Sequence, residues 1–349
     1  MAFATTSNRV AANVPSTVEK SLMQPAAPAS ISSNRPANAR THDAAVVTIL
    51  LCTFNGERFL VEQLNSISAQ TYAHWRLVVS DDGSSDATCA LLQDFAERPE
   101  NRDRVALRKG AQQGAVMNFL SLATDKTIGG TYFAYCDQDD IWFPDKIERA
   151  LTWLGAQSVA VPALYCSRTA NVTPDGQQVG HSPLFRKAPS FNNALVQSLA
   201  GGNTMVFNEA ARTLLVAAGT CDVVAHDWWT YMLVSGAGGV VHYDEVPSLS
   251  YRQHEGNQIG ANQGLKAACV RGWMVLSGQW TNWTDRNIAA LQANGALLTP
   301  QNLAALRAFC RLRNAPFCRK LRLGHRRGVY RQTILGQLSL VIGLLLRRI

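Results

Sequence analysis

The chain has 349 residues, of which 47% are hydrophobic and 17% charged, enough for one large domain or two small ones with a proper core. Its net charge of +8 is uneven, because twelve of the 33 Lys and Arg residues, and no Asp or Glu, follow Asp285. The rest of the chain is slightly acidic. We therefore expect no nucleic-acid partner, and an anionic partner for the basic tail alone.

Residues 1–43 are rich in Ala, Ser, Asn, Pro and Thr and lack apolar periodicity, so we predict that they are disordered. They contain no continuous apolar stretch of the kind that a secretory signal needs, and a transit peptide is the weaker alternative. The eight cysteines form no CxxC pair, which is typical of small core residues in a reducing compartment.

From residue 44 onwards, apolar strands alternate with helices, which predicts a parallel sheet with right-handed crossovers. The expected strands are 44–52, 75–80, 104–107 and 132–136. Polar residues end three of them, at 53–55, 81–82 and 137–140, and these ends should line one edge of the sheet, where ligands bind. We find no GxGxxG after the first strand and no Walker A motif, which disfavours a dehydrogenase or a P-loop enzyme.

The acidic cluster after the fourth strand is the sharpest signal in the chain. Asp137, Asp139 and Asp140 follow an aromatic run directly, and crowded carboxylates repel one another unless a cation neutralises them. Mg²⁺ or Mn²⁺ suits such oxygen ligands, and Mg²⁺ usually completes its shell with water and substrate phosphates. One interpretation is therefore a metal that holds a diphosphate. The alternative is a solvated acidic turn that caps the helix at Pro144.

Past residue 155 the alternation loosens. We expect a strand at 163–167, a tight turn at 174–176 and a Gly-led strand at 201–208 that runs into a helix. Asp227 stands beside two tryptophans at a helix start, where it either caps the helix or serves as a general base facing a sugar. Arg252 and His254 lie in a polar cluster after a strand, although a lone His is more often structural than a ligand.

Six motifs stand in a fixed order between Ala45 and Asn257: TFNG, SDDGSSD, CDQDDIW, GGNTMVFN, HDWW and YRQHEGN. This order resembles family 2 glycosyltransferases of the bacterial rhamnosyltransferase type. The resemblance implies a GT-A fold, which is α/β with a Rossmann-like, mostly parallel sheet flanked by helices. The implied domains are a disordered segment 1–43, a GT-A domain 44–260 and a basic helical region 261–349.

The resemblance also implies residue roles. On the donor side, Thr53, Asn55 and Asp82 would contact the nucleoside of a nucleotide-sugar. Asp139 and His254 would hold the divalent metal, either Mg²⁺ or Mn²⁺, with Asp137 nearby and Arg252 on a phosphate. On the other side of the sugar, Asp227 would be the catalytic base, and Gly202 and Asn203 would shape the acceptor site. Residues 110–114 depart from the Asn-Gly-Gly-like stretch that is common in the family.

These residues suit an inverting transfer, in which a single displacement needs one base and a stabilised leaving diphosphate. The leading hypothesis is transfer of a sugar, such as L-rhamnose from a dTDP donor, to a polysaccharide or lipid-linked glycan. The alternatives are a UDP-hexose-dependent transferase and a non-catalytic GT-A scaffold protein at the membrane. A sugar-phosphate nucleotidyltransferase normally has a Gly-rich basic loop, which is absent after residue 52.

The C-terminal region is helical and basic in its pattern. Residues 311–331 are dense in Arg, and 333–346 are largely apolar but shorter than the ~20 residues that span a bilayer. Basic flanks around a short apolar helix suit an anchor on an anionic membrane surface. We therefore expect a peripheral protein at the inner face of the cytoplasmic membrane. The alternative is a helix packed on the domain with a solvated basic face.

Overall fold

The computed structural model describes residues 45–254, 278–316 and 328–349, and these residues belong to one compact unit. The predicted disorder of residues 1–43 lies outside the described residues. The last three residues of the YRQHEGN motif, 255–257, lie outside them as well.

A seven-stranded sheet forms the centre of the fold, in the order β10-β6-β9-β4-β1-β2-β3. Neighbouring strands are parallel except at β9, which runs antiparallel to both β4 and β6. The strands are β1 (Val47–Thr53), β2 (Trp75–Asp81), β3 (Val105–Lys109), β4 (Tyr132–Cys136), β6 (Ala163–Ser167), β9 (Val206–Asn208) and β10 (Val240–Asp244). The predicted α/β class and the mostly parallel sheet are thereby confirmed.

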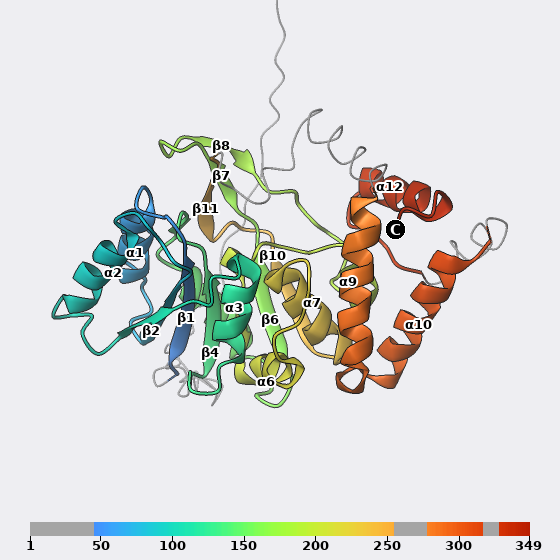
Figure 1. The fold of residues 1–349 in the computed structure, drawn as a ribbon, viewed down its shortest axis with the longest axis horizontal. Coiled ribbons are helices and arrows are strands. Elements are labelled where there is room, and N and C mark those ends of the chain that lie inside the picture. The colour runs from blue at the N-terminus through green and yellow to red at the C-terminus, as the bar shows by residue number, and fades with distance from the viewer. Residues whose placement is uncertain (1–44, 255–277, 317–327) are drawn as a thin grey trace, which may run out of the picture. The chain divides into compact units, whose positions relative to one another are not determined.

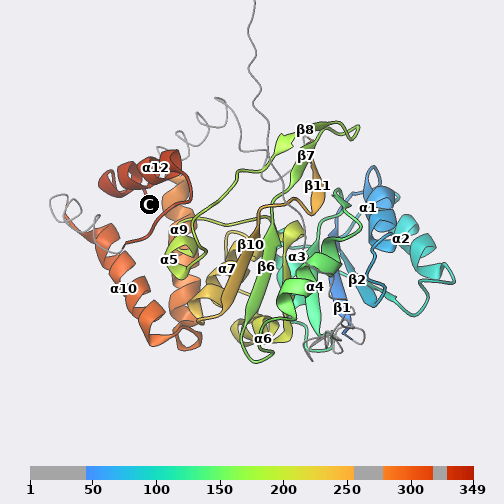
Figure 2. The same ribbon diagram turned by 180° about the vertical axis from the view of Figure 1, so that it is seen from behind.

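Helices cover both faces of this sheet. They are α1 (Leu60–Ser68), α2 (Thr88–Glu97), α3 (Ala115–Thr124), α4 (Lys146–Leu154), α5 (Phe191–Ala194), α6 (Glu209–Ala218) and α7 (His226–Gly236). Figure 1 shows α3, α6 and α7 in front of the sheet, and Figure 2 shows α4 on the opposite face. Alternate residues of β1 serve the two faces, since Ile49 packs in the cluster of α1, α2 and α4, and Leu50 in that of α3 and α7.

A second sheet of four strands follows the order β5-β11-β7-β8. Its strands are β5 (Ile141–Trp142), β11 (Leu249–Arg252), β7 (Ala170–Val172) and β8 (Gln178–His181). Strand β5 comes directly after the acidic residues that end β4, and it pairs with β11. This sheet therefore brings the end of β11, with Arg252 and His254, to the acidic cluster.

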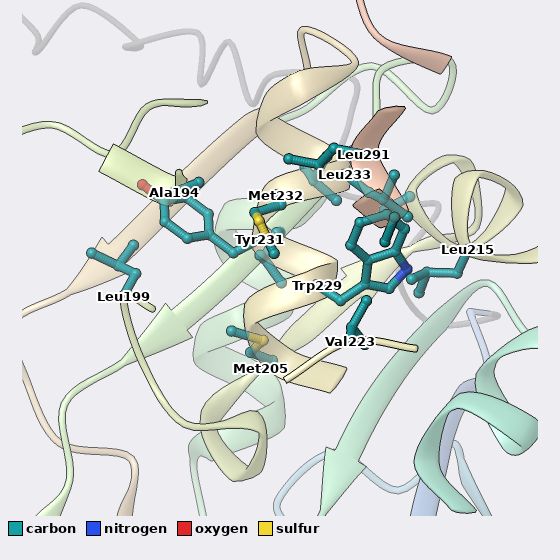
Figure 3. Packing of buried hydrophobic residues seen from close by; sticks show 14 of the residues in the cluster. Ala194, Leu199, Met205, Leu215, Val223, Trp229, Tyr231, Met232, Leu233 and Leu291 are labelled. Atoms are coloured by element: carbon teal, nitrogen blue, oxygen red, sulfur yellow. The ribbon is translucent and has the colours of Figure 1, made fainter. Parts of the chain in front are cut away.

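The C-terminal helices share a core with the α/β part. They are α9 (Gln279–Ala293), α10 (Pro300–Asn314) and α12 (Ile334–Leu345), with a short 3₁₀ helix, η2 (Gly295–Leu297), between the first two. Figure 3 shows Trp229 and Leu233 of α7 packed near Leu291 of α9, and Trp229 is fully buried. Helix α7 is thus fixed along most of its length, which makes its first turn a rigid support.

Helix α12 buries one face and exposes an apolar one. Its Leu340 and Leu344 pack in the core. The residues that lie on the outside are all large and apolar: Ile334, Leu335, Leu338, Val341, Ile342 and, just past the helix end, Leu346. The helix packs on the domain, as one sequence interpretation held, but the face that it leaves exposed is apolar rather than basic. No helix among the described residues is long and apolar enough to cross a membrane.

Candidate active site

The loop after β1 is fastened to the loop after β2. Thr53 is buried and its hydroxyl donates to Asp81 Oδ2 at 2.8 Å. Asn55 has a φ of 47°, a left-handed conformation that Asn tolerates better than most residues, and its side-chain oxygen accepts from the backbone N–H of Ser85 at 2.8 Å. Two of the residues predicted to contact the nucleoside, Thr53 and Asn55, are therefore hydrogen-bonded to the 81–85 turn.

Asp82, the third predicted nucleoside contact, is bonded to a different loop. Its two carboxylate oxygens accept from the backbone N–H groups of Gln112 and Gly114, each at 2.8 Å, and the residue is 8% exposed. The bonds fix residues 110–114, the stretch that departs from the family's pattern, just before α3. In this structure Asp82 shapes the loop, and its contact with a nucleoside stays a prediction.

Gln138 joins the acidic residues to the loop after β1. Its side chain accepts from the backbone N–H of Phe54 at 2.8 Å and donates to the carbonyl of the same residue at 3.0 Å. A side chain at Gly56 would collide with the Gln138 amide and force it out of this position. The segment 137–140, which we call the metal loop, is thus coupled to the predicted nucleoside site.

Asp139 and His254 form the pair that the sequence predicted as metal ligands. Asp139 Oδ2 lies 2.8 Å from His254 Nε2. Arg252 is 2% exposed, and its guanidinium donates to the carbonyls of Asp139 and Pro174 and pairs with Glu62 at 2.7 Å. These bonds hold the end of β11 against the metal loop. The predicted phosphate contact of Arg252 stays a prediction.

Asp140 faces away from this pair and into the protein. It is fully buried, and its Oδ2 accepts from the Asn203 side-chain amide at 2.5 Å. The carbonyl of Asn203 in turn accepts from Lys146 Nζ at 2.9 Å. Burial lowers the pKa of Lys146 to about 7, and the ammonium group lies 4.5 Å above the centre of the Trp142 ring.

Asp227, the predicted base, lies in the first turn of α7. Its Oδ2 accepts from the backbone N–H of Gly202 at 3.0 Å, and its Oδ1 accepts from that of Trp228 at 2.5 Å. Gly202 belongs to η1 (Gly202–Thr204), the short 3₁₀ helix before β9. Burial raises the pKa of Asp227 to about 6, and these hydrogen bonds offset part of that rise. The carboxylate is therefore ionised at neutral pH, and its pKa is close enough to 7 for it to accept a proton as a general base.

The charges of the metal loop support a bound cation. Burial, and then the charge of Asp139, raise the pKa values of both Asp137 and Asp140. Among the described residues no group of three or more His, Cys, Asp or Glu side chains is arranged to hold a metal. One carboxylate with an imidazole beside it could hold Mg²⁺ or Mn²⁺ if water and substrate phosphates supplied the remaining ligands.

Two sequence interpretations can now be compared with the structure. The acidic residues do not cap the helix near Pro144, because α4 begins at Lys146 and its N-cap residue, Asp145, makes no side-chain capping bond. Asp227 does bind its own helix start, but one of its oxygens also reaches across to η1. The roles of the individual site residues themselves remain predictions.

Sequence reasoning missed the contacts that join loops distant in the chain. Gln138 is 84 positions from Phe54, and Asn203 is 63 positions from Asp140. A Gln between two predicted metal-site acids, and an Asn after two glycines, were the only signals in the sequence. Phe54, which follows Thr53, is 56% exposed, an unusual position for a large aromatic side chain.

The comparisons with known proteins agree with this geometry. Residues 48–215 match the family described as glycosyl transferase family 2. The chain is 28% identical over 260 residues to a protein named dTDP-rhamnosyl transferase RfbG from Shigella flexneri, which covers 72% of this chain and 87% of that one.

A shorter match, 30% identical over 112 residues, is to the Escherichia coli protein named UDP-Glc:alpha-D-GlcNAc-diphosphoundecaprenol beta-1,3-glucosyltransferase WfgD. It covers 32% of this chain and 42% of that one. Among solved structures, TarS of S. aureus in complex with UDP-GlcNAc aligns with a TM-score of 0.50 at 15% identity, over 75% of this chain and 86% of that one.

The mostly parallel sheet flanked by helices matches the GT-A fold. The sequence matches are more specific: residues 48–215 are similar to glycosyl transferase family 2, and relatives named as glycosyltransferases extend the similarity, so the chain is a transferase.

Proposed function

We propose that this protein is an inverting glycosyltransferase that moves a sugar from a nucleotide-sugar to a hydroxyl of a growing cell-surface glycan. The observation that carries the proposal is the position of Asp227. It lies partly buried in the first turn of α7, its pKa is raised to about 6, and η1 links it to the metal loop. A single carboxylate base, separate from the acids that face the diphosphate, is the requirement of a single displacement.

Each group has one task in this mechanism. Asp227 accepts the proton of the acceptor hydroxyl as the new glycosidic bond forms and the bond to the diphosphate breaks. Asp139 and His254 would hold the divalent cation, Mg²⁺ or Mn²⁺, which supplies charge stabilisation for the leaving diphosphate. Asp137 lies beside this pair and, in its deprotonated form, would add negative charge next to such a cation.

The proposal for the donor nucleotide starts from the loops after β1 and β2, which carry the predicted nucleoside contacts. Thr53, Asn55 and Asp82 lie at the ends of β1 and β2, and the exposed ring of Phe54 offers an aromatic face on which a base can stack. We propose a dTDP donor carrying L-rhamnose, because the similarity to RfbG extends over most of both chains. A UDP-hexose donor is the second candidate, supported by the shorter match to WfgD.

We further propose that the acceptor is a polysaccharide or a lipid-linked glycan and that the protein works at the inner face of the cytoplasmic membrane. The exposed apolar face of α12 supports this proposal. Its twelve helical residues include no charged one, and Arg347 and Arg348 follow directly after Leu346. An apolar face with basic ends suits a helix that lies in the surface of an anionic bilayer.

A thermal-shift panel tests the donor site. The purified protein is heated with dTDP, dTDP-rhamnose, UDP and UDP-glucose, each with and without Mn²⁺, because a ligand of the folded state raises the midpoint. We expect a Mn²⁺-dependent shift with the dTDP species, and its loss in Asp139→Ala. A shift with the UDP species alone would favour a UDP-hexose donor over dTDP-rhamnose. Binding without any transfer to a glycan acceptor would favour the non-catalytic scaffold.

A further inference from the structure

A buried polar connection runs from the metal loop to the predicted base. The Asn203 side-chain amide donates to Asp140 Oδ2 at 2.5 Å, and the backbone N–H of the preceding residue, Gly202, donates to Asp227 Oδ2 at 3.0 Å. Asn203 is 3% exposed and Asp140 fully buried, so water does not compete for this bond. Two carboxylates from distant parts of the chain are therefore held by adjacent residues.

The short helix between the two carboxylates is stiff. Within η1 and its flanks, the N–H of Thr204 donates to the carbonyl of Gly201 at 3.0 Å, and that of Met205 to Gly202 at 2.8 Å. Lys146 Nζ fixes the carbonyl of Asn203 from the other side. Because these bonds lock the backbone, a displacement of Asn203 moves the Gly202 N–H that orients the base.

Asp140 depends on Asn203 for its position. Among the residues that the structure describes, its other oxygen accepts one long bond, 3.4 Å, from the backbone N–H of Arg252. A buried carboxylate that loses its better hydrogen-bond donor is costly, so Asn203 stays bonded to Asp140, and η1 follows the position of Asp140. The bond thus ties the position of the metal loop to that of η1.

We infer that Asn203 is a positioning residue, which sets the orientation of Asp227 according to the position of the metal loop. Donor binding at that loop then aligns the base for the acceptor hydroxyl. This inference rests on the proposed function, in which Asp227 is the base, and it assigns to Asn203 an effect on the transfer step rather than on donor affinity.

Asn203→Ala tests the inference on the full chain. Loss of a residue that orients a catalytic group typically costs 10–100-fold, so we expect kcat to fall by about that factor. We expect the KM for the donor, and the affinity for UDP or dTDP with Mn²⁺ measured by calorimetry, to stay within about threefold, since donor contacts are retained. Asn203→Ser, which is smaller but still polar, serves if the alanine variant is poorly folded.

Asn208→Ala is the matched control. Asn208 lies five positions further along the same segment, is 6% exposed, and its side chain bonds Val161 and caps α6 at Ala211. Its loss should lower the melting temperature by an amount similar to that in Asn203→Ala but leave kcat unchanged. A fall in kcat that tracks melting temperature in both variants would overturn the inference.

Exchanging the two side chains provides a second test. Asn203→Asp removes the donor and sets two carboxylates against each other, whereas the double variant Asp140→Asn/Asn203→Asp restores a donor and an acceptor in opposite order. Recovery of kcat in the double variant, relative to Asn203→Asp alone, supports the connection. A loss of Mn²⁺–nucleotide affinity together with kcat in Asn203→Ala would contradict it. If the wild-type protein transferred no sugar at all, the proposed function itself would be refuted.

Discussion

Polar substitutions on the exposed face of α12 test membrane binding with a magnitude that follows from the structure. Leu335 is 72% exposed and Leu338 54%. Full burial of a leucine side chain is worth about 1.5–3 kcal/mol, so the two exposed portions together contribute about 3 kcal/mol when they enter a bilayer. Leu335→Gln/Leu338→Gln should therefore weaken partitioning by roughly 100-fold.

Sedimentation with lipid vesicles measures this partitioning. We expect the wild-type protein to bind vesicles that contain anionic phosphatidylglycerol more strongly than neutral ones, and added salt to reduce the difference. The double variant should lose most binding to both. Its melting temperature should stay near that of the wild type, because both side chains are already exposed in the folded protein.

Val159→Gln/Val246→Gln is the matched control. These two valines are 84% and 59% exposed and lie outside α12. Their replacement removes a comparable apolar area but should leave vesicle binding unchanged. Equal binding by the wild type and the α12 variant would refute the membrane proposal, and a protein partner would then be the remaining occupant of this face.

Three further predictions concern the base. Asp227→Asn should abolish transfer while the Mn²⁺–nucleotide affinity, measured by calorimetry, stays close to that of the wild type; loss of both would indicate a structural role. Because the pKa of Asp227 is about 6, kcat should be flat above pH 7 and fall about tenfold per unit below pH 6, where the base is protonated. A profile that is level down to pH 5 would exclude Asp227 as the base. Gly202→Ala would place a Cβ against His226 Nε2, so it should lower kcat strongly with little effect on nucleotide binding; wild-type kcat would show that η1 can shift freely.

The central strands could be predicted because their burial leaves a clear trace in the sequence. All seven residues of β1 are buried, and a strand covered on both faces reads as a continuous apolar run. The direction of strand β9 within the sheet was harder to predict, because its three buried residues show no periodicity that indicates whether the strand runs parallel or antiparallel to its neighbours. Its antiparallel pairing with β4 and β6 depends on where the preceding η1 turns the chain, which no local pattern encodes.

For α12, the sequence predicted a short apolar helix but not which face is covered. Leu340 is buried and Leu338 exposed, yet the two are chemically identical neighbours on the helix. Amphipathic periodicity identifies a buried face only when the other face is polar, and here both faces are apolar. Packing against the rest of the core therefore determines which face of α12 is buried.

The acidic cluster shows how the site could be partly predicted. Side chains at the carboxyl end of a central parallel strand lie at the ligand edge, a rule that located Asp137 and Asp139 from topology alone. The partners of these residues could not be found in this way. Gln138 and Asp140 bind backbone and side-chain groups that only the folded chain brings near, and such contacts follow no sequence spacing.

The metal loop explains why the distant parts of this site can act together. The chain bends at Gln138 and Asp139, and three neighbouring residues reach three different elements. Gln138 holds the loop after β1, Asp139 meets His254 after β11, and Asp140 holds η1. One short loop thereby contacts the loop after β1, the end of β11 and η1, which carry the predicted nucleoside contacts, the predicted metal ligand His254 and the support of the predicted base. Substitutions at these three positions should be strongly non-additive, because each one moves the support that the other two require.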